Sequence, residues 1–290
     1  MTNRLAVLIS GSFRNFESVW EINKLILDRS GVFYEVFFHT WDTNPNLKGD
    51  SLSIEYKTKF YFSLFAKKYK SFDQILSVQL IKKKFGFRCV LVDQFHENSL
   101  ASLYNLGTPN TNQRYRQLLN SVGQYHGIDA CRKEMIKDGS FSHFLRLRSD
   151  FRMDELKFSE LFENDFVFFG QLLPTAEGPV GDQCFGGVVE KTGEILDMLG
   201  TLHQITHELA WDISEPMVLE EEVIRRRIYP FRDQWKIAYF EGAGKIIRPE
   251  LIREKFSASY LKKIFSHNTK YLLNLPSRIL SRIDKFFRTD

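Results

Sequence analysis

Two arginines and an aspartate alternate with leucines in residues 143–152, and this pattern carries the clearest chemical signal in the sequence. The leucines predict a buried strand, and strand side chains repeat on one face every second residue. Arg146, Arg148 and Asp150 are therefore expected on one face near the carboxyl end of the strand. Guanidinium groups bind phosphate, and carboxylate oxygens bind Mg²⁺ or Mn²⁺. The segment predicts a site for a diphosphate with a divalent cation; the alternative is an edge strand whose charged face is solvated and paired with itself.

A short turn after the first apolar run is a second candidate site. Gly11, Ser12 and Arg14 follow the apolar residues 5–9. Backbone N–H groups of this turn and Arg14 would face a ligand at the carboxyl end of the strand, where open α/β sheets bind. A plain turn with a surface arginine is the alternative. The turn matches neither the GxGxxG fingerprint nor a Walker loop, which disfavours NAD chemistry.

Two further polar residues suit a nucleotide sugar. Asp42 follows His39, Thr40 and Trp41 at the end of the second predicted strand, where an aromatic face and a carboxylate fit a nucleoside. Asp42 alternatively caps a turn, and His39 is more often a buried hydrogen-bonded residue than a metal ligand. Gln124, on the longest predicted helix, points either toward a sugar or to solvent.

Asp182 and Gln183 lie between stretches that contain glycine. A carboxylate and an amide at such a junction can hold sugar hydroxyls, and Asp182 can deprotonate an acceptor hydroxyl as a general base. The neighbouring glycines permit close backbone approach to a ligand. A simple turn aspartate is the alternative.

The elements that must position these residues form an alternating series. A strand, a tight turn, a helix and a second strand open the chain, which predicts a three-layer α/β fold with a parallel sheet. Strands are predicted at residues 4–10, 32–39, 89–93, 144–148, 165–170, 182–189 and 236–240. Helices are predicted at residues 17–29, 72–84, 113–137, 156–162, 191–209 and 216–227.

The composition is that of a soluble globular protein. The 290 residues are 43% hydrophobic and 26% charged, which suits one large domain with an appendage. Because no apolar stretch reaches the roughly 18 residues of a spanning helix and the first run is too short for a signal peptide, we expect a cytoplasmic protein. Three cysteines without a CxxC pair fit reduced thiols rather than a disulfide framework or a zinc site.

Positive charge is concentrated at the C-terminus. Residues 245–290 contain 11 Lys and Arg against 4 Asp and Glu, a local charge of +7 against −3 for the rest of the chain. The net charge of +4 is too small to indicate a nucleic-acid partner. Apolar residues recur between the basic ones, so we predict a domain at residues 1–244 and a basic amphipathic helical tail at 245–290. Such a tail would lie on the anionic inner face of the cell membrane or pack back on the domain.

The segment Leu145-Arg146-Leu147-Arg148-Ser149-Asp150 resembles the R-x-R-(S/P)-D phrase of bacterial surface-polysaccharide glycosyltransferases, including lipopolysaccharide-synthesis proteins of the WavE type. The turn with Gly11 and Arg14, the His39 to Asp42 strand end, the long helix and Asp182-Gln183 occur in a similar order, so the resemblance covers about residues 4–240. It implies a GT-A-like fold, one α/β domain with a Rossmann-like nucleotide-binding half. It also implies transfer of a sugar from a nucleotide-diphosphate donor to a lipid-linked or growing surface polysaccharide.

The same resemblance implies roles for individual residues. Asp150 would contact Mn²⁺ or Mg²⁺, but Arg148 occupies the first aspartate position of the usual Asp-x-Asp motif, so the arginines alone are the metal-independent alternative. The residues expected to bind the nucleotide sugar are Gly11, Ser12, Arg14, Asp42, Gln124, Arg146, Arg148 and Ser149, and those expected to act in catalysis are Asp182 and Gln183. Two other functions stay open, a phosphoryl or nucleotidyl transferase acting on a sugar or polysaccharide precursor and a non-catalytic membrane-associated binding protein.

Overall fold

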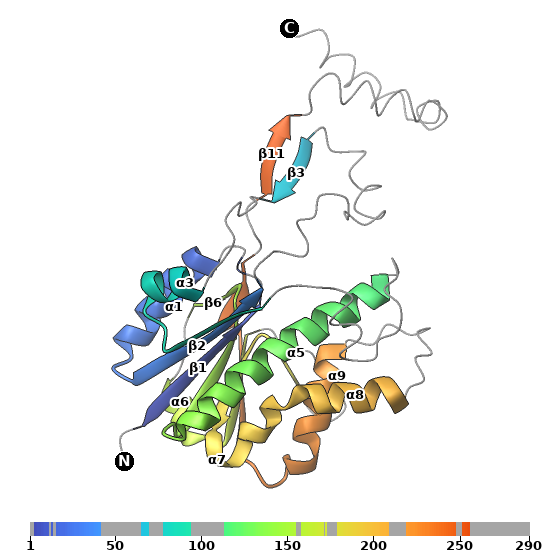
Figure 1. The fold of residues 1–290 in the computed structure, drawn as a ribbon. Coiled ribbons are helices and arrows are strands. Elements are labelled where there is room, and N and C mark those ends of the chain that lie inside the picture. The colour runs from blue at the N-terminus through green and yellow to red at the C-terminus, as the bar shows by residue number, and fades with distance from the viewer. Residues whose placement is uncertain are drawn as a thin grey trace, which may run out of the picture. The chain divides into compact units, whose positions relative to one another are not determined.

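The computed structural model describes residues 3–11, 13, 16–41, 65–69, 78–93, 113–154, 158–170, 172, 179–208, 219–247 and 251–255. The chain divides into two compact units, one of residues 1–51 with 71–250 and one of residues 52–70 with 251–290. The first unit has a mixed α/β fold, drawn in Figure 1 with several of its helices and strands labelled.

A seven-stranded sheet runs through the described part of the first unit, in the order β4-β2-β1-β5-β8-β7-β9. Its strands are β1 (Arg4–Ser10), β2 (Phe33–Trp41), β4 (Cys89–Asp93), β5 (His143–Arg148), β7 (Phe166–Gly170), β8 (Cys184–Val188) and β9 (Ile237–Glu241). Strand β8 is antiparallel to both of its neighbours, whereas the other pairs in the sheet are parallel. The expected parallel α/β sheet is therefore present, with one reversed strand.

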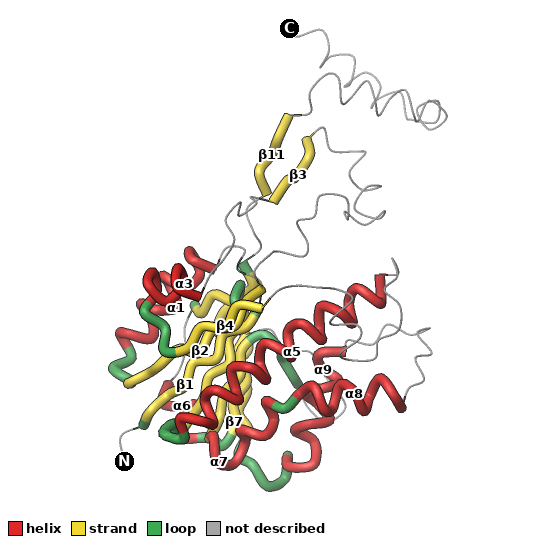
Figure 2. The backbone as a smooth tube through the Cα atoms, viewed as in Figure 1, coloured by secondary structure: helices red, strands yellow, loops and turns green. Residues whose placement is uncertain are grey.

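Helices cover both faces of this sheet and make three layers (Figures 1 and 2). One face is covered by α1 (Phe16–Arg29), α3 (Val78–Phe85) and α6 (Phe158–Glu163). The other is covered by α5 (Gln113–Asp138), η2 (Gly193–Leu196), α8 (Met198–Glu208) and α9 (Leu219–Ile228), with α7 (Val189–Thr192) directly before η2. The short helix η3 (Tyr229–Phe231) follows α9.

Strand β5 shows how the alternation of side chains places charge on one of these faces. Leu145 and Leu147 belong to the apolar cluster on the α1 side, and Phe144 belongs to the cluster on the α5 side. Since side chains alternate along a strand, Arg146 and Arg148 share the α5 side with Phe144. The two arginines thus face the layer that α5 contributes.

Helix α5 packs with the face that its sequence predicts. Val122, Tyr125, Ile128, Cys131 and Met135 recur at three- and four-residue steps, and all five are buried. The helix ends at Asp138, where the next residue has the positive φ of +65° that favours glycine.

Where the first unit is described, its predicted helices and strands are present, with two differences. The helix predicted at residues 191–209 is broken into η2 and α8, with α7 before them. A short antiparallel pair, β6 (Phe151–Met153) with β10 (Gly244–Ile246), was not predicted because three residues are too few to show a period.

The predicted helical tail at residues 245–290 also differs from the structure. Residues 245 and 246 belong to strand β10, and residues Leu251–Lys255 form strand β11, which pairs antiparallel with β3 (Phe65–Tyr69), so the helix prediction is wrong at these residues. The pairing joins segments far apart in the chain, and such non-local contacts override local periodicity. Residues 256–290, which carry most of the predicted amphipathic tail, lie outside the described residues. Of the helices described, none has the length and apolar character needed to cross a membrane.

Candidate functional site

The described residues of the predicted site lie where the strand order of the sheet changes direction. From β1 the chain adds β2 and β4 on one side, and β5 joins β1 on the other side. The carboxyl ends of β1 and β5 therefore flank a topological switch point, the position at which open α/β sheets bind ligands. Ser10 and Arg148 are register partners there, and the Ser149 amide donates a 3.1 Å hydrogen bond to the Ser10 carbonyl oxygen.

Gly11 brings the backbone of the β1 turn against the residue that follows β5. Its φ is +137°, and a Cβ added at this position would lie 2.5 Å from the Ser149 hydroxyl oxygen. Only glycine fits here without strain, so Gly11 lets the β1 turn lie against Ser149 at the switch point. Ser12, Arg14 and Asp42, which were predicted to join them, lie outside the described residues.

Arg148 links two carboxylates at this edge. Its Nε and Nη2 donate hydrogen bonds of 2.7 and 3.1 Å to the two oxygens of Asp150. Its Nη1 lies 3.9 Å from Oδ2 of Asp182. The Arg148 side chain is 30% exposed, whereas both carboxylates are buried.

Asp182 and Gln183 reach the same edge because β8 runs antiparallel to β5. The amino end of β8 lies beside the carboxyl end of β5, and the Arg148 amide donates to the Gln183 carbonyl oxygen at 2.9 Å. Helix α5 adds Gln124, whose Nε2 donates a 3.1 Å hydrogen bond to Oδ2 of Asp182. Gln124, Asp182 and Gln183 thus lie beside Arg148 at one edge of the sheet.

Arg146 is fully buried below Arg148, so it does not face solvent in this structure. Its Nη1 donates a 2.7 Å hydrogen bond to the Gln183 carbonyl oxygen, and its guanidinium lies 5.9 Å from the centre of the Phe185 ring. Burial lowers the pKa of Arg146 to about 10, and the Asp182 charge opposes this shift, so the side chain stays protonated at neutral pH. Arg146 thus holds a positive charge beneath Gln183.

The surroundings of Asp150 do not fit the Mn²⁺ or Mg²⁺ ion that the family resemblance implies. Both of its oxygens accept hydrogen bonds from Arg148, and the carboxylate is buried. Hard divalent ions take several oxygen ligands. Among the described residues, Asp150 belongs to no group of three side chains with metal-ligand spacing. We therefore derive no step through a metal at Asp150.

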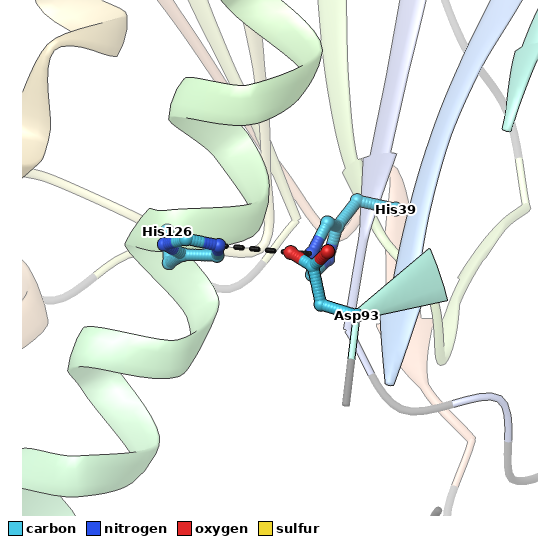
Figure 3. Close-up of side chains that lie close together, drawn as sticks. All are labelled: His39, Asp93 and His126. Atoms are coloured by element: carbon cyan, nitrogen blue, oxygen red, sulfur yellow. Dashed lines mark hydrogen bonds and ion pairs between the residues drawn. The ribbon is translucent and has the colours of Figure 1, made fainter. Parts of the chain in front are cut away.

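A second polar cluster lies at the same edge of the sheet, and the sequence analysis named only one of its members. Oδ2 of Asp93, the last residue of β4, lies 3.0 Å from Nε2 of His39 and 2.9 Å from Nε2 of His126. Figure 3 shows His126 reaching from α5 toward Asp93 and His39. The hydrogen bond from His39 lowers the pKa of Asp93 to about 2, and burial lowers the pKa of His39.

The position of Asp93 gave a signal that sequence reasoning could have used. Asp93 ends a predicted strand, as Asp42 follows another, and the carboxyl ends of parallel strands meet at one edge of a sheet. His126 gave no such signal, because it is one polar residue on a long helix and only the packing of α5 turns it toward β2 and β4.

A search of protein-family models finds no match to this chain, and a search of curated proteins also finds none.

Proposed function

We propose that this protein is a GT-A-like glycosyltransferase that transfers a sugar from a nucleotide-diphosphate donor to a lipid-linked or growing surface polysaccharide. One observation carries the proposal. The guanidinium of Arg148, on a side chain that is 30% exposed, bridges Asp150 and Asp182 at the switch point between β1 and β5. A fixed cation at the carboxyl edge of an open α/β sheet suits the charge of a diphosphate.

In this proposal the donor diphosphate lies between the turn at Gly11 and Arg148. Backbone N–H groups next to a glycine can approach phosphate closely, and a guanidinium stabilises the charge that develops on the departing diphosphate. The bidentate pair with Asp150 holds Arg148 in a single orientation, so little reorganisation is needed during transfer. We propose the metal-independent alternative for this step, because Arg148 occupies the oxygens of Asp150.

Asp182 is proposed to orient or deprotonate the acceptor hydroxyl. Gln124 donates a hydrogen bond to one of its oxygens, which leaves the other oxygen for an acceptor. A carboxylate that is held in place beside the diphosphate site meets the geometric requirement for a general base. Gln183 lies next to it, with its main-chain oxygen held by Arg146 and Arg148.

The acceptor and the location of the protein extend the proposal. A lipid-linked or growing glycan is the acceptor class that the family resemblance implies, and the enzyme would then work at the inner face of the cell membrane. The basic tail that would attract anionic lipid lies outside the described residues.

A binding screen tests the donor site. We expect a nucleotide-diphosphate sugar to raise the melting temperature, since a ligand that binds only the folded state stabilises it by mass action. The Arg148→Gln variant should lose this shift. Arg152→Gln is the matched control, because Arg152 pairs with Asp154 at the same two-residue spacing and its side chain is 29% exposed, against 30% for Arg148. A screen in which no nucleotide shifts the wild-type protein would overturn the donor site.

The products distinguish the proposed reaction from its rivals. Glycosyl transfer releases a nucleoside diphosphate from a nucleotide-diphosphate sugar, whereas nucleotidyl transfer from a nucleoside triphosphate releases pyrophosphate. We expect nucleoside diphosphate with the wild-type protein and little with Asp182→Asn. Release of pyrophosphate would replace the proposal with a nucleotidyl transferase, and binding without turnover of any donor and acceptor pair would favour a non-catalytic protein.

A further inference from the structure

We propose that His39, Asp93 and His126 form a binding site for a divalent transition-metal ion of the zinc class. The inference does not rest on the proposed transferase function, because it concerns different side chains. It also differs from the Mn²⁺ or Mg²⁺ ion expected at Asp150, and it involves none of the cysteines, whose spacing was predicted not to fit a zinc site.

The donor set decides the class of metal. Two imidazole nitrogens and one carboxylate oxygen suit Zn²⁺, Co²⁺ or Ni²⁺, whereas Mg²⁺ and Ca²⁺ prefer sites made of oxygen atoms. Two histidines with one carboxylate are also a common set in catalytic zinc sites. Three such side chains come together here from β2, β4 and α5 (Figure 3).

The distances agree with a single ion between the three side chains. Asp93 Oδ2 lies 3.0 Å from His39 Nε2 and 2.9 Å from His126 Nε2, and the ligand atoms all lie within 4.8 Å of one another. Zinc bonds of about 2.0–2.2 Å place neighbouring tetrahedral ligands a little more than 3 Å apart. Small side-chain rotations would therefore suffice to bind the ion.

The site is buried on one side and exposed on the other. His39 is fully buried, and the ring of Trp41 stacks on the ring of His126 with 5.6 Å between their centres. In contrast, the side chains of Asp93 and His126 are 45% and 26% exposed. Three protein ligands with one exposed side match a site that keeps a position for water or substrate, rather than a closed structural site.

Unpaired buried atoms beside His39 support the same conclusion. Within the described residues, His39 Nδ1 and Ser10 Oγ are both buried without a hydrogen-bond partner, and the two residues face each other in the strand register. Buried polar atoms without partners are uncommon in folded proteins. With an ion on Nε2, Nδ1 of His39 would carry the ring proton, on the strand partner of Ser10.

Metal titration of the full chain tests the site. After chelator dialysis, we expect Zn²⁺ to bind saturably in calorimetry and Co²⁺ to give visible absorption bands of low coordination number, with Mg²⁺ producing neither. His126→Gln and Asp93→Asn should each weaken binding at least about tenfold. Asp28→Asn is the carboxylate control, because Asp28 is as exposed as Asp93 and also accepts two side-chain hydrogen bonds.

A second control addresses the histidine pair that sequence spacing provides elsewhere. His203 and His207 are four residues apart in α8, a spacing that can also bind Zn²⁺. The double variant His203→Gln with His207→Gln should keep the wild-type affinity and the Co²⁺ spectrum. Circular dichroism of each variant confirms that it is folded. The Co²⁺ spectrum of the wild-type protein tests the site without any substitution. Failure of the folded wild-type protein to bind Zn²⁺, or unchanged binding in folded His126→Gln, overturns the proposal.

Discussion

Nη1 of Arg146 donates a 2.7 Å hydrogen bond to the main-chain carbonyl oxygen of Gln183. The same oxygen accepts a 2.9 Å hydrogen bond from the Arg148 amide. One buried cation therefore fixes the segment before β8 against the end of β5. The hydrogen bond from Arg146 to Gln183 therefore helps to position Arg148 and Asp182, even though buried Arg146 itself cannot reach a ligand.

Replacement of Arg146 by methionine should separate its structural role from its role in positioning. We expect the free energy of unfolding of Arg146→Met to stay within about 1 kcal/mol of the wild type or to rise, because an apolar side chain of similar size avoids the desolvation of a buried charge. Nucleotide-diphosphate binding should weaken, because Gln183 and Arg148 lose their common anchor. Denaturant unfolding and equilibrium binding measure the two effects.

Arg146→Ala is the comparison and should lower the free energy of unfolding by about 2–4 kcal/mol, because it leaves a cavity. Unchanged nucleotide binding in a stable Arg146→Met would show that Arg146 only packs and does not position the site.

Gly11→Ala should destabilise the protein more than Gly31→Ala. Both glycines have positive φ, but a Cβ at Gly11 would lie 2.5 Å from Ser149 Oγ, whereas a Cβ at Gly31 has nothing within 4 Å. Strain and the clash together should cost about 2–3 kcal/mol at Gly11, against about 1 kcal/mol at Gly31. Adding Ser149→Ala removes the closest atom and should recover part of the loss. Equal costs at both glycines in urea unfolding would contradict the close approach of Gly11 to Ser149.

Two glycines one turn apart in α5 should respond to alanine in opposite directions. Alanine favours a helix by about 1 kcal/mol over glycine, and the nearest atom to a Cβ at Gly123 would be in Trp41, at 3.4 Å. At Gly127 a Cβ would lie 2.6 Å from His39 Nδ1 and 3.0 Å from Ser10 Cβ. We expect Gly123→Ala to be neutral or stabilising and Gly127→Ala to be destabilising in thermal unfolding. A stabilised Gly127→Ala would mean that α5 does not pack this closely on His39.

Asp165 should contribute stability that acid removes. Its oxygens accept hydrogen bonds from Lys191 Nζ at 2.6 Å and from the Lys236 amide at 3.1 Å, and the bond from Lys191 lowers the pKa of Asp165. A carboxyl whose pKa is lower in the folded state stabilises the fold above its unfolded pKa of about 3.9, and this contribution disappears as the pH falls through the folded value.

The matching experiment compares Asp165→Asn with the wild type across pH. At pH 7 we expect a loss of about 0.5–1.5 kcal/mol in the free energy of unfolding, shrinking progressively below about pH 4. Asp233→Asn is the control, because the Asp233 side chain is 95% exposed and should show little change at any pH. A difference for Asp165→Asn that stays constant from pH 7 to pH 3 would rule out the titration of this carboxylate as its source.

Local patterns in the sequence were enough to predict most of the fold. The run of apolar residues in β1 and the three- and four-residue steps of Val122, Tyr125 and Ile128 report which side chains avoid water, and that property needs no knowledge of distant partners. The same patterns placed Gly11, Arg148 and Asp150 at strand ends. They failed at β6 and β10, which are too short to show a period, and at β11, whose strand form comes from its pairing with β3.

The sequence alone determined the α/β class, the strand ends and the chemical types of the residues on them. Only the tertiary structure decided which of those residues meet: it buried Arg146 beneath Gln183, closed Arg148 onto Asp150, and brought His126 to His39 and Asp93. The physical reason is that a side chain's periodicity records its burial, whereas its partners depend on strand order and on how α5 packs across β1, β2 and β4.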